Sequence, residues 1–335
     1  MAVLITGGAG YIGSHMAWRL LDAGEEVIIL DNLSTGHAWS IPGRAVFVKG
    51  DAGSTEAFAE ARASAPIDAV IHFAGSVVVP ESIAEPLKYY RNNTCTTLGL
   101  LENCLAAGVE TFIFSSTAAV YADPGDELVG EDAALLPATP YGRSKLMIEE
   151  ILADVSAASG LHHAILRYFN VAGADPAGRT GHSTRGATHL LKVACEAALG
   201  KRNGMAVFGT DYPTRDGTAE RDFIHVSDLV EAHYLALQKL RAARENFTLN
   251  CGYGRGYSVL EMIAAVKAES GTDFPVALEG RREGDLARVV ADSTAIRTAL
   301  AWRPAYDDLT GIARHALAWE RHLMSRNATE SHSGE

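Results

Sequence analysis

The chain of 335 residues contains only four cysteines, and no two of them form a C-x-x-C pair. They are scattered at Cys95, Cys104, Cys195 and Cys251, so we expect neither a disulfide framework nor a zinc site, and we predict no metal ion. Long apolar runs are also missing, since stretches such as Ala69–Phe73 are far shorter than the roughly 18 residues that cross a bilayer. No basic and apolar leader precedes the first strand pattern, which favours a cytoplasmic location.

Positive charge is scarce as well. The chain has 29 Lys and Arg against 41 Asp and Glu, a formal net charge of −12. Such an acidic chain has no electrostatic reason to bind DNA or RNA phosphates, so we expect no nucleic-acid partner. Any anionic ligand must therefore be held by a few well-placed groups. Hydrophobic residues at 47% and charged residues at 21% are typical of a globular protein and exclude extensive disorder.

The first half of the chain alternates short apolar runs with helical patterns. Runs such as Val3–Thr6, Val27–Leu30 and Thr111–Ser115 are continuously apolar, which is typical of parallel strands covered on both faces. Helical spacing separates them, as at Tyr11–Ala23. The alternation predicts the α/β class, with a doubly wound parallel (Rossmann) sheet built from right-handed crossovers.

The pattern changes after about Phe169, where loops rich in Gly, Asp, Arg and Pro separate short helices and strands. We expect residues 1–172 to form the Rossmann domain, to which residues 222–251 return. Residues 173–323 are expected to form most of a smaller C-terminal α+β substrate-binding domain. Residues 324–335 are small and polar, and we expect a disordered tail there.

A glycine-rich turn joins the first strand to the first helix. Gly7, Gly10 and Gly13 are spaced three apart, and residues without a Cβ let backbone N–H groups and the helix N-terminus approach a pyrophosphate. Asp31 closes the second strand, where it can accept hydrogen bonds from both ribose hydroxyls and would repel a 2′-phosphate. The sequence therefore predicts a site for NAD rather than NADP. Asp51, after the third strand, is compatible with an adenine contact.

Tyr141 and Lys145 are four residues apart at the start of a predicted helix over residues 141–159, so they share one helical face. An ammonium group near a phenol favours the phenolate and lowers the pKa of Tyr from about 10, and the positive charge of NAD would act in the same direction. Tyr141 is thereby predicted to be a general base near neutral pH. Thr117 ends an earlier strand and offers a hydroxyl to the same substrate oxygen.

These motifs together resemble the extended short-chain dehydrogenases/reductases. The residues that carry the resemblance are Thr6–Gly13, Asp31–Ser34, His72–Gly75, Ser115–Thr117, Tyr141–Lys145 and Leu166–Asn170. Later segments are similar to the UDP-glucose 4-epimerase family in particular, namely Gly209–Thr214, Asp216–Thr218, Arg221–Val226 and Arg281–Asp285. The similarity runs from about residue 2 to about residue 320.

The resemblance implies an isomerase that interconverts UDP-galactose and UDP-glucose with tightly held NAD. In that family the tyrosine matching Tyr141 removes the proton of the sugar 4-hydroxyl, and the hydride leaves C4 and returns to the other face of the 4-keto sugar. The residue matching Thr117 binds O4, and Lys145 would bind the nicotinamide ribose. Family members are usually homodimers, here through helices near residues 87–107 and 141–159.

The resemblance also assigns binding residues. Those implied for NAD are Gly7, Gly10, Tyr11, Ile12, Gly13, Asp31, Asn32, Leu33, Ser34, Thr35, Gly36, Asp51, Ala52, Phe73, Ala74, Gly75, Val77, Asn92, Tyr141, Lys145 and Phe169. Those implied for the UDP-sugar are Thr117, Tyr141, Asn170, His189, Leu190, Ala206, Val207, Phe208, Arg221, Arg282, Asp285 and Val289. Their chemistry fits, because guanidinium groups suit a diphosphate, Asp285 can accept from ribose hydroxyls, and Phe208 can pack on uracil.

Four positions depart from the family pattern. Thr117 replaces a frequent Ser and keeps the hydroxyl, whereas Val77 replaces a Lys common near the cofactor phosphates and His189 replaces a frequent Asn. Val289 stands where some members carry a bulky Tyr against the sugar C2 substituent. The smaller residue leaves volume, and our hypothesis is that UDP-GlcNAc and UDP-GalNAc also fit.

Three other functions involve related sequence features. A sugar-nucleotide 4,6-dehydratase needs an acid pair directly after the strand-end hydroxyl, where this chain has Ala118 and Ala119. A UDP-xylose/UDP-arabinose 4-epimerase uses the same machinery and stays open. A non-catalytic NAD-binding sensor module stays open too, although such proteins typically lose the Tyr or the Lys that are both intact here.

Overall fold

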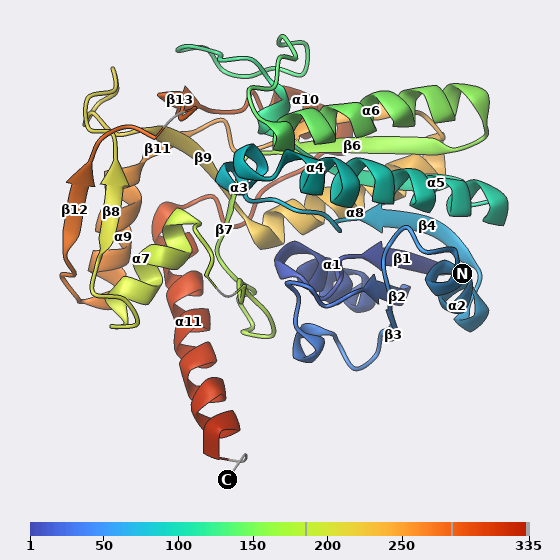
Figure 1. Ribbon diagram of the computed structural model, residues 1–335, viewed down its shortest axis with the longest axis horizontal. Helices are drawn as coiled ribbons and strands as arrows, with labels where there is room; N and C mark the ends of the chain where they lie inside the picture. Colours follow the sequence, from blue (N-terminus) through green and yellow to red (C-terminus); the bar gives the residue numbers. More distant parts are fainter. Residues whose placement is uncertain (185, 283, 333–335) are drawn as a thin grey trace.

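The computed structural model describes residues 1–184, 186–282 and 284–332 (Figure 1). Seven parallel strands form its central sheet in the order β10-β6-β5-β4-β1-β2-β3. The order reverses between β1 and β4, which confirms the predicted doubly wound parallel sheet. The strands span Ala2–Thr6 (β1), Glu26–Asp31 (β2), Val46–Lys49 (β3), Ile67–His72 (β4), Thr111–Thr117 (β5), His162–Tyr168 (β6) and Phe247–Cys251 (β10).

Helices cover both faces of this sheet, because successive residues of each strand point to opposite sides. Ile5 of β1 packs with Met16 and Leu229 in one core cluster, under helices α1 and α8. Leu4 packs with Leu100 and Ile148 in the other, under helices α2, α5 and α6. The covering helices are α1 (Tyr11–Asp22), α2 (Thr55–Ser64), α5 (Thr96–Ala107), α6 (Pro140–Ala158) and α8 (Val226–Ala243).

Smaller sheets and helices are grouped at one end of the molecule (Figure 1). Strand β9 (Glu220–His225) pairs with β7 (Asn170–Ala172), β11 (Gly256–Ser258) and β13 (Arg288–Val289), and β8 (Met205–Phe208) pairs with β12 (Val276–Glu279). Because β7 follows β6 directly, the chain passes from the large sheet into this part at Phe169. The helices here are α7 (Leu190–Ala198) and α9 (Val259–Ser270), whereas α10 (Thr294–Leu300) packs against β10 and α8 of the larger part.

The long helix expected near residues 87–107 is interrupted. It consists of α4 (Pro86–Tyr89), a π-helical turn η2 (Tyr90–Cys95) and α5, and it follows the short helix α3 (Val79–Ala84). A π-turn inserts an extra residue into the helical ladder and is often found beside a functional site. Here it turns the Asn93 side chain toward Ser76, whose N–H donates to Asn93 Oδ1 at 2.7 Å.

The prediction of a disordered tail over residues 324–335 is wrong. Helix α11 (Leu309–His332) continues through most of this segment and projects from the body in Figure 1. No glycine or proline occurs between Met324 and His332, so nothing in the sequence ends the helix there. Residues 333–335 lie outside the described part of the chain. None of the helices in the described ranges is long and apolar enough to cross a membrane.

Candidate active site

A large cavity opens at the carboxyl ends of the central strands. Its volume is about 1230 Å³, and its walls include the glycine-rich turn after β1 and the segment after β4. These two strands flank the point where the strand order reverses, which is the place where doubly wound sheets bind ligands. The strand ends are tied together there, because Thr6 Oγ1 lies 2.6 Å from His72 Nδ1.

The glycine-rich turn leaves no room for side chains. A Cβ on Gly13 would lie 2.2 Å from the carbonyl oxygen of Gly7, and Gly7 itself has a φ of +72° and lies against the backbone of Ala74. Helix α1 can begin this close to β1 only because these positions lack a Cβ. The turn therefore forms a cradle of backbone N–H groups at a helix N-terminus, as a pyrophosphate requires.

Asp31 at the end of β2 organises the adjacent loop. Its Oδ2 accepts from the N–H of Ala9 at 2.9 Å, and its Oδ1 accepts from the N–H of Leu33 at 2.7 Å. That second bond supports the left-handed backbone of Leu33, whose φ is +60°. Leu33 and Gly36 do not reach the cavity, because Leu33 forms this turn and Gly36 packs its backbone against Ala9.

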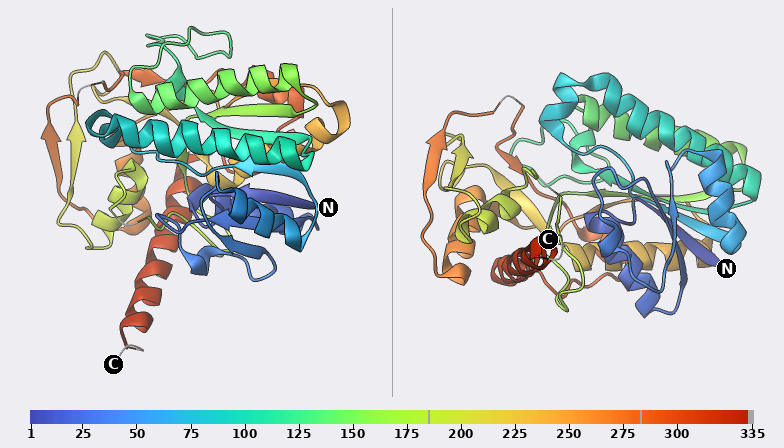
Figure 2. Two further views of the ribbon diagram at one scale, coloured as in Figure 1. Left: turned by 45° about the vertical axis from the view of Figure 1, so that its right-hand side comes forward. Right: turned by 60° about the horizontal axis from the view of Figure 1, so that its bottom comes forward.

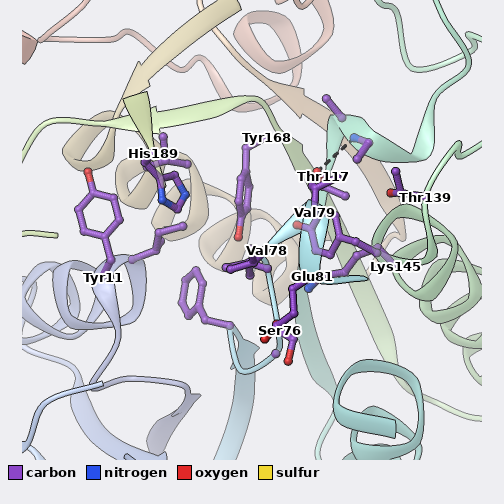
Figure 3. A pocket seen from close by; sticks show the side chains of 18 of the residues that line it. Tyr11, Ser76, Val78, Val79, Glu81, Thr117, Thr139, Lys145, Tyr168 and His189 are labelled. Carbon is purple, nitrogen blue, oxygen red and sulfur yellow. Dashed lines mark hydrogen bonds between the residues drawn. The ribbon is translucent and has the colours of Figure 1, made fainter. Parts of the chain in front are cut away.

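The predicted catalytic residues converge on the cavity from two elements. Tyr141 and Lys145 come from the first turns of α6, and Thr117 ends β5; all three are buried and line the cavity. The N-terminus of α6 is fixed by Thr139, whose hydroxyl accepts from the N–H of Gly142 at 3.3 Å. Figure 3 shows Thr117 and Lys145 on one side, Tyr11 and His189 on the other, and Tyr168 between them.

The electrostatics of this group differ from the prediction. Burial raises the pKa of Tyr141 above its usual value, although a hydrogen bond with the Thr117 hydroxyl lowers it. The Lys145 ammonium donates to the carbonyl oxygen of Ser115 at 3.0 Å, and burial lowers the pKa of Lys145 to about 8. The groups of the protein therefore do not by themselves give the lowered pKa that was predicted for Tyr141.

Most of the residues implied for NAD line this one cavity, although they come from distant parts of the chain. The lining residues are Gly7, Gly10, Tyr11, Ile12, Gly13, Asp31, Asn32, Ser34, Thr35, Asp51, Ala52, Phe73, Ala74, Gly75, Val77, Asn92, Tyr141, Lys145 and Phe169. The ends of several strands and the start of α6 thus contribute to one shared cavity.

The residues implied for the UDP-sugar divide into two groups. Those that line the large cavity are Thr117, Tyr141, Asn170, His189, Arg221, Asp285 and Val289. Leu190 lines a small adjoining cavity of about 50 Å³ instead, which shares Tyr11, Asn170 and His189 with the large one. The structure does not bring Ala206, Val207, Phe208 or Arg282 to either cavity.

The outlying residues have other partners. Val207 is buried in the hydrophobic core on β8, whose alternation points Ala206 and Phe208 to the opposite side of the strand. The Arg282 guanidinium lies over the Phe208 ring at 3.5 Å from its centroid, a cation–π contact. Glu283, between Arg282 and Asp285 in the motif, lies outside the described residues.

Several cavity residues were not predicted. Tyr168 lies beside Thr117, because the two are paired in the register of β5 and β6, and that register was the signal that could have found it. His182 stacks on Tyr11 with ring centroids 4.7 Å apart, but nothing in its loop sequence indicates this. Glu81 and Ser76 also line the cavity, after β4. Within the described ranges, no group of three or more His, Cys, Asp and Glu side chains is placed to hold a metal ion.

Comparisons with known proteins match this geometry. The model of the NAD dependent epimerase/dehydratase family matches residues 3–252. The chain is 54% identical over 321 residues to a UDP-glucose 4-epimerase of Azospirillum brasilense, covering 96% of this chain and 92% of that one. It is similar to the structure of a UDP-glucose 4-epimerase from Stenotrophomonas maltophila with bound NAD and formylated UDP-arabinopyranose, with a TM-score of 0.93, 41% identity, and 98% and 99% of the two chains covered. For a UDP-Glc/GlcNAc 4-epimerase from Campylobacter jejuni the TM-score is 0.83 at 46% identity, with 96% and 99% covered.

Proposed function

The chain belongs to the NAD dependent epimerase/dehydratase family, and from this premise we propose that it interconverts UDP-galactose and UDP-glucose. The observation that carries the proposal is the convergence of Tyr141, Thr117 and Lys145 on one cavity that also contains the glycine-rich cradle. A candidate base, a hydroxyl partner and a cation are thereby available to one ligand, as the proposed reaction requires. Most residues implied for NAD and seven of those implied for the UDP-sugar line this one cavity, which supports the proposal.

Tyr141, Thr117 and Lys145 have different roles in the proposed reaction. Tyr141 takes the proton of the sugar 4-hydroxyl and returns it, while Thr117 hydrogen-bonds the same oxygen and keeps it in line with the phenol. Lys145 supplies a fixed positive charge that stabilises the phenolate form. The chemistry that NAD would supply in this cavity is reversible hydride acceptance from the sugar C4. The ionised form of Tyr141 thus depends on positive charge beside it, since burial alone opposes it.

Two observations support NAD as a ligand of this cavity. The cradle formed by Gly7 and Gly13 would be filled by any Cβ, so its shape is reserved for close backbone approach. Each Asp31 oxygen accepts a backbone N–H and retains a second lone pair for a ribose hydroxyl. A 2′-phosphate would meet this carboxylate, so we propose NAD rather than NADP.

We propose that Arg221 binds the diphosphate and Asp285 the uridine ribose. Arg221 lines the cavity, and its Nη1 donates to the carbonyl oxygen of Glu220 at 2.9 Å, which leaves the other guanidinium donors available. Asp285 also lines the cavity and is exposed. Arg282 would have to leave the Phe208 ring to reach the same diphosphate, so we assign it and Phe208 a role only once substrate is bound.

The test is incubation of the purified protein with UDP-galactose and no added NAD, followed by separation of the products. We expect UDP-glucose to form, and Tyr141→Phe to lower the rate by about 10²–10⁴-fold, which is the usual contribution of a general base. Tyr90→Phe, which removes a phenol that does not line the cavity, is the control. Bound NAD without any conversion would indicate the sensor module instead, and net NADH release would indicate a dehydrogenase.

Val289 supports a second activity on UDP-GlcNAc and UDP-GalNAc. Its small side chain lines the cavity on β13, so it leaves space beside the sugar. We expect the parent protein to turn over UDP-GlcNAc and Val289→Tyr to lose this activity while it retains UDP-galactose conversion. A UDP-GlcNAc rate no higher than in buffer would refute the second activity. UDP-xylose and UDP-arabinose belong in the same panel, because they test the pentose alternative.

We propose a homodimer that uses the outer face of α3–α6. Apolar side chains are exposed along it, namely Ile83 (54%), Leu87 (73%), Leu98 (41%), Leu105 (41%) and Met147 (42%). Figure 2 shows α5 and α6 side by side on one outer face, and residues seven apart such as Leu98 and Leu105 point to the same side of a helix. Light scattering should give twice the chain mass, and Leu98→Glu with Leu105→Glu should give a monomer.

Two further assignments complete the proposal. We divide the chain functionally into an NAD-binding part, residues 1–172 with 222–251, and a UDP-sugar-binding part within residues 173–323. This division is supported by β10, which pairs with β6 in the large sheet, whereas residues 222–225 belong to β9 of the smaller sheet. We also propose a cytoplasmic location, in keeping with four cysteines that are free thiols.

A further inference from the structure

A buried ion pair lies directly behind the catalytic residues. Glu149 on α6 and Arg167 on β6 are each 5% exposed. Arg167 Nη2 donates to Glu149 Oε2 at 2.5 Å, and Arg167 Nε donates to both carboxylate oxygens at 3.1 Å. Removing two charges from water is costly, and an apolar pair of similar volume usually serves stability as well or better. The pair therefore calls for an explanation beyond packing.

Helix α6 contacts three consecutive residues at the end of β5. Lys145 donates to the carbonyl oxygen of Ser115, Glu149 accepts from the hydroxyl of Ser116, and Tyr141 is hydrogen-bonded to Thr117. Positions 141, 145 and 149 lie on successive turns of one helical face, so all three side chains reach the end of the same strand. Glu149 is thus the last of three side chains that fix the strand carrying Thr117.

We propose that Glu149 is a positioning residue for the reaction, which fixes the end of β5 and stabilises the positive charge of Lys145 beside Tyr141. This inference rests on the function proposed above. Arg167 holds the carboxylate in place, and it is itself anchored because its Nη1 donates to the hydroxyl of Tyr121 at 2.8 Å. The bidentate geometry explains an arginine here, since a planar guanidinium presents a fixed fork of donors to both carboxylate oxygens and a lysine ammonium does not.

Within the part of the chain that the structure describes, Glu149 is the charged group that acts on Lys145. The titratable groups around Lys145 and its partner Ser115 are His72 of β4, Tyr168 of β6, His233 of α8, and Tyr141 and Glu149 of α6. Burial lowers the pKa of His72 to about 3 and that of His233 to about 4, and it raises the pKa of Tyr168, so these groups are neutral near pH 7. Burial also lowers the pKa of Lys145 to about 8, and the Glu149 carboxylate acts against that shift.

The experiment compares pH profiles of kcat/KM for UDP-galactose, measured on the NAD-loaded protein. The ammonium form of Lys145 is lost as pH rises through its pKa, so the parent should lose activity above about pH 8. Glu149→Gln keeps an oxygen for Ser116 but removes the charge. We expect its alkaline limb to move about one pH unit lower, which is roughly a tenfold loss of kcat/KM on that limb.

Matched variants separate positioning from a merely structural role. Glu150→Gln removes an exposed carboxylate from the next residue of α6 and should leave the limb unchanged. Glu149→Asp keeps the charge and should restore the limb while it lowers kcat through the shorter reach to Ser116. If Glu149→Gln does not fold, Glu149→Gln with Arg167→Met, which leaves no unpaired charge, is measured in its place.

The outcomes are distinct. A lower melting temperature with an unmoved alkaline limb, in an active parent, would mean that the ion pair only supports the fold and would overturn this inference. A parent protein that does not convert UDP-galactose at any pH would overturn the proposed function instead. A limb that moves in the charge-removing variant and returns in Glu149→Asp supports the positioning role.

Discussion

Gly13 is the position where a single methyl group tests the dinucleotide cradle most directly. A Cβ there would lie 2.2 Å from the Gly7 carbonyl oxygen and 2.8 Å from Gly8 Cα. Since Cβ atoms essentially never approach within 3.0 Å, Gly13→Ala forces the turn and α1 apart by at least about 0.8 Å. Both neighbours are backbone atoms of a tight turn, so neither can rotate away. Overpacking of this kind costs about 1–3 kcal/mol, and if the strain falls on the cradle, NAD affinity drops roughly 5- to 150-fold.

The assay is the amount of NAD retained per chain after purification, together with the NAD dissociation constant and the melting temperature. Gly43→Ala is the control, because Gly43 is exposed and a Cβ there would meet nothing within 4 Å. We expect the control to match the parent and Gly13→Ala to retain much less NAD. If Gly13→Ala binds NAD with the affinity of the control and is equally stable, the cradle does not hold the cofactor and the reasoning is refuted.

Two other predictions follow from single side chains. Asp31→Ser removes the carboxylate that accepts from the Ala9 and Leu33 N–H groups, and with it the charge that opposes a 2′-phosphate. The ratio of the NADP dissociation constant to the NAD dissociation constant should therefore fall about tenfold or more. An unchanged ratio would contradict the assignment of Asp31. Trp302 is 1% exposed, and its Nε1 donates to the carbonyl oxygen of Asp228 at 3.0 Å. Trp302→Ala should therefore lower the free energy of unfolding, measured in urea, by about 3–5 kcal/mol. The control Leu136→Ala, at a 72% exposed position, should leave that free energy almost unchanged.

The features that the sequence predicts correctly are those determined by residues close together in the chain. The apolar runs and intervening helical patterns identified the sheet because each parallel strand is buried on both faces along its own length. The glycine-rich turn could be recognised because Gly7 and Gly13 meet within one strand–helix connection. The tail after Met324 was mispredicted for the opposite reason. Its composition is that of a loop, but no glycine or proline occurs in it before His332, so α11 continues.

Features that depend on contacts between distant segments were less accessible. Phe208 and Arg282 were expected to contact the substrate, but they contact each other, which depends on how the loops after β8 and β12 meet. The π-turn that directs Asn93 toward Ser76 leaves no mark in the helical periodicity of residues 87–107. No propensity or spacing in one segment specifies such pairings, because each depends on the relative placement of two elements.

The environment of Tyr141 combines both kinds of information. A spacing of four residues places Lys145 on the same helical face as Tyr141, and the same spacing extends to Glu149. The sequence of the helix is therefore sufficient to predict that all three side chains share one face. What each one touches is decided by the register of β5 and β6, which sets Ser116 opposite Arg167 and Thr117 opposite Tyr168. Lys145 therefore binds the strand instead of lying free beside the phenol, and its charge depends on a carboxylate that an arginine from another strand holds in place. The surroundings of Tyr141 are for this reason set by the strand register, which places Thr117, as much as by the helix that carries the tyrosine.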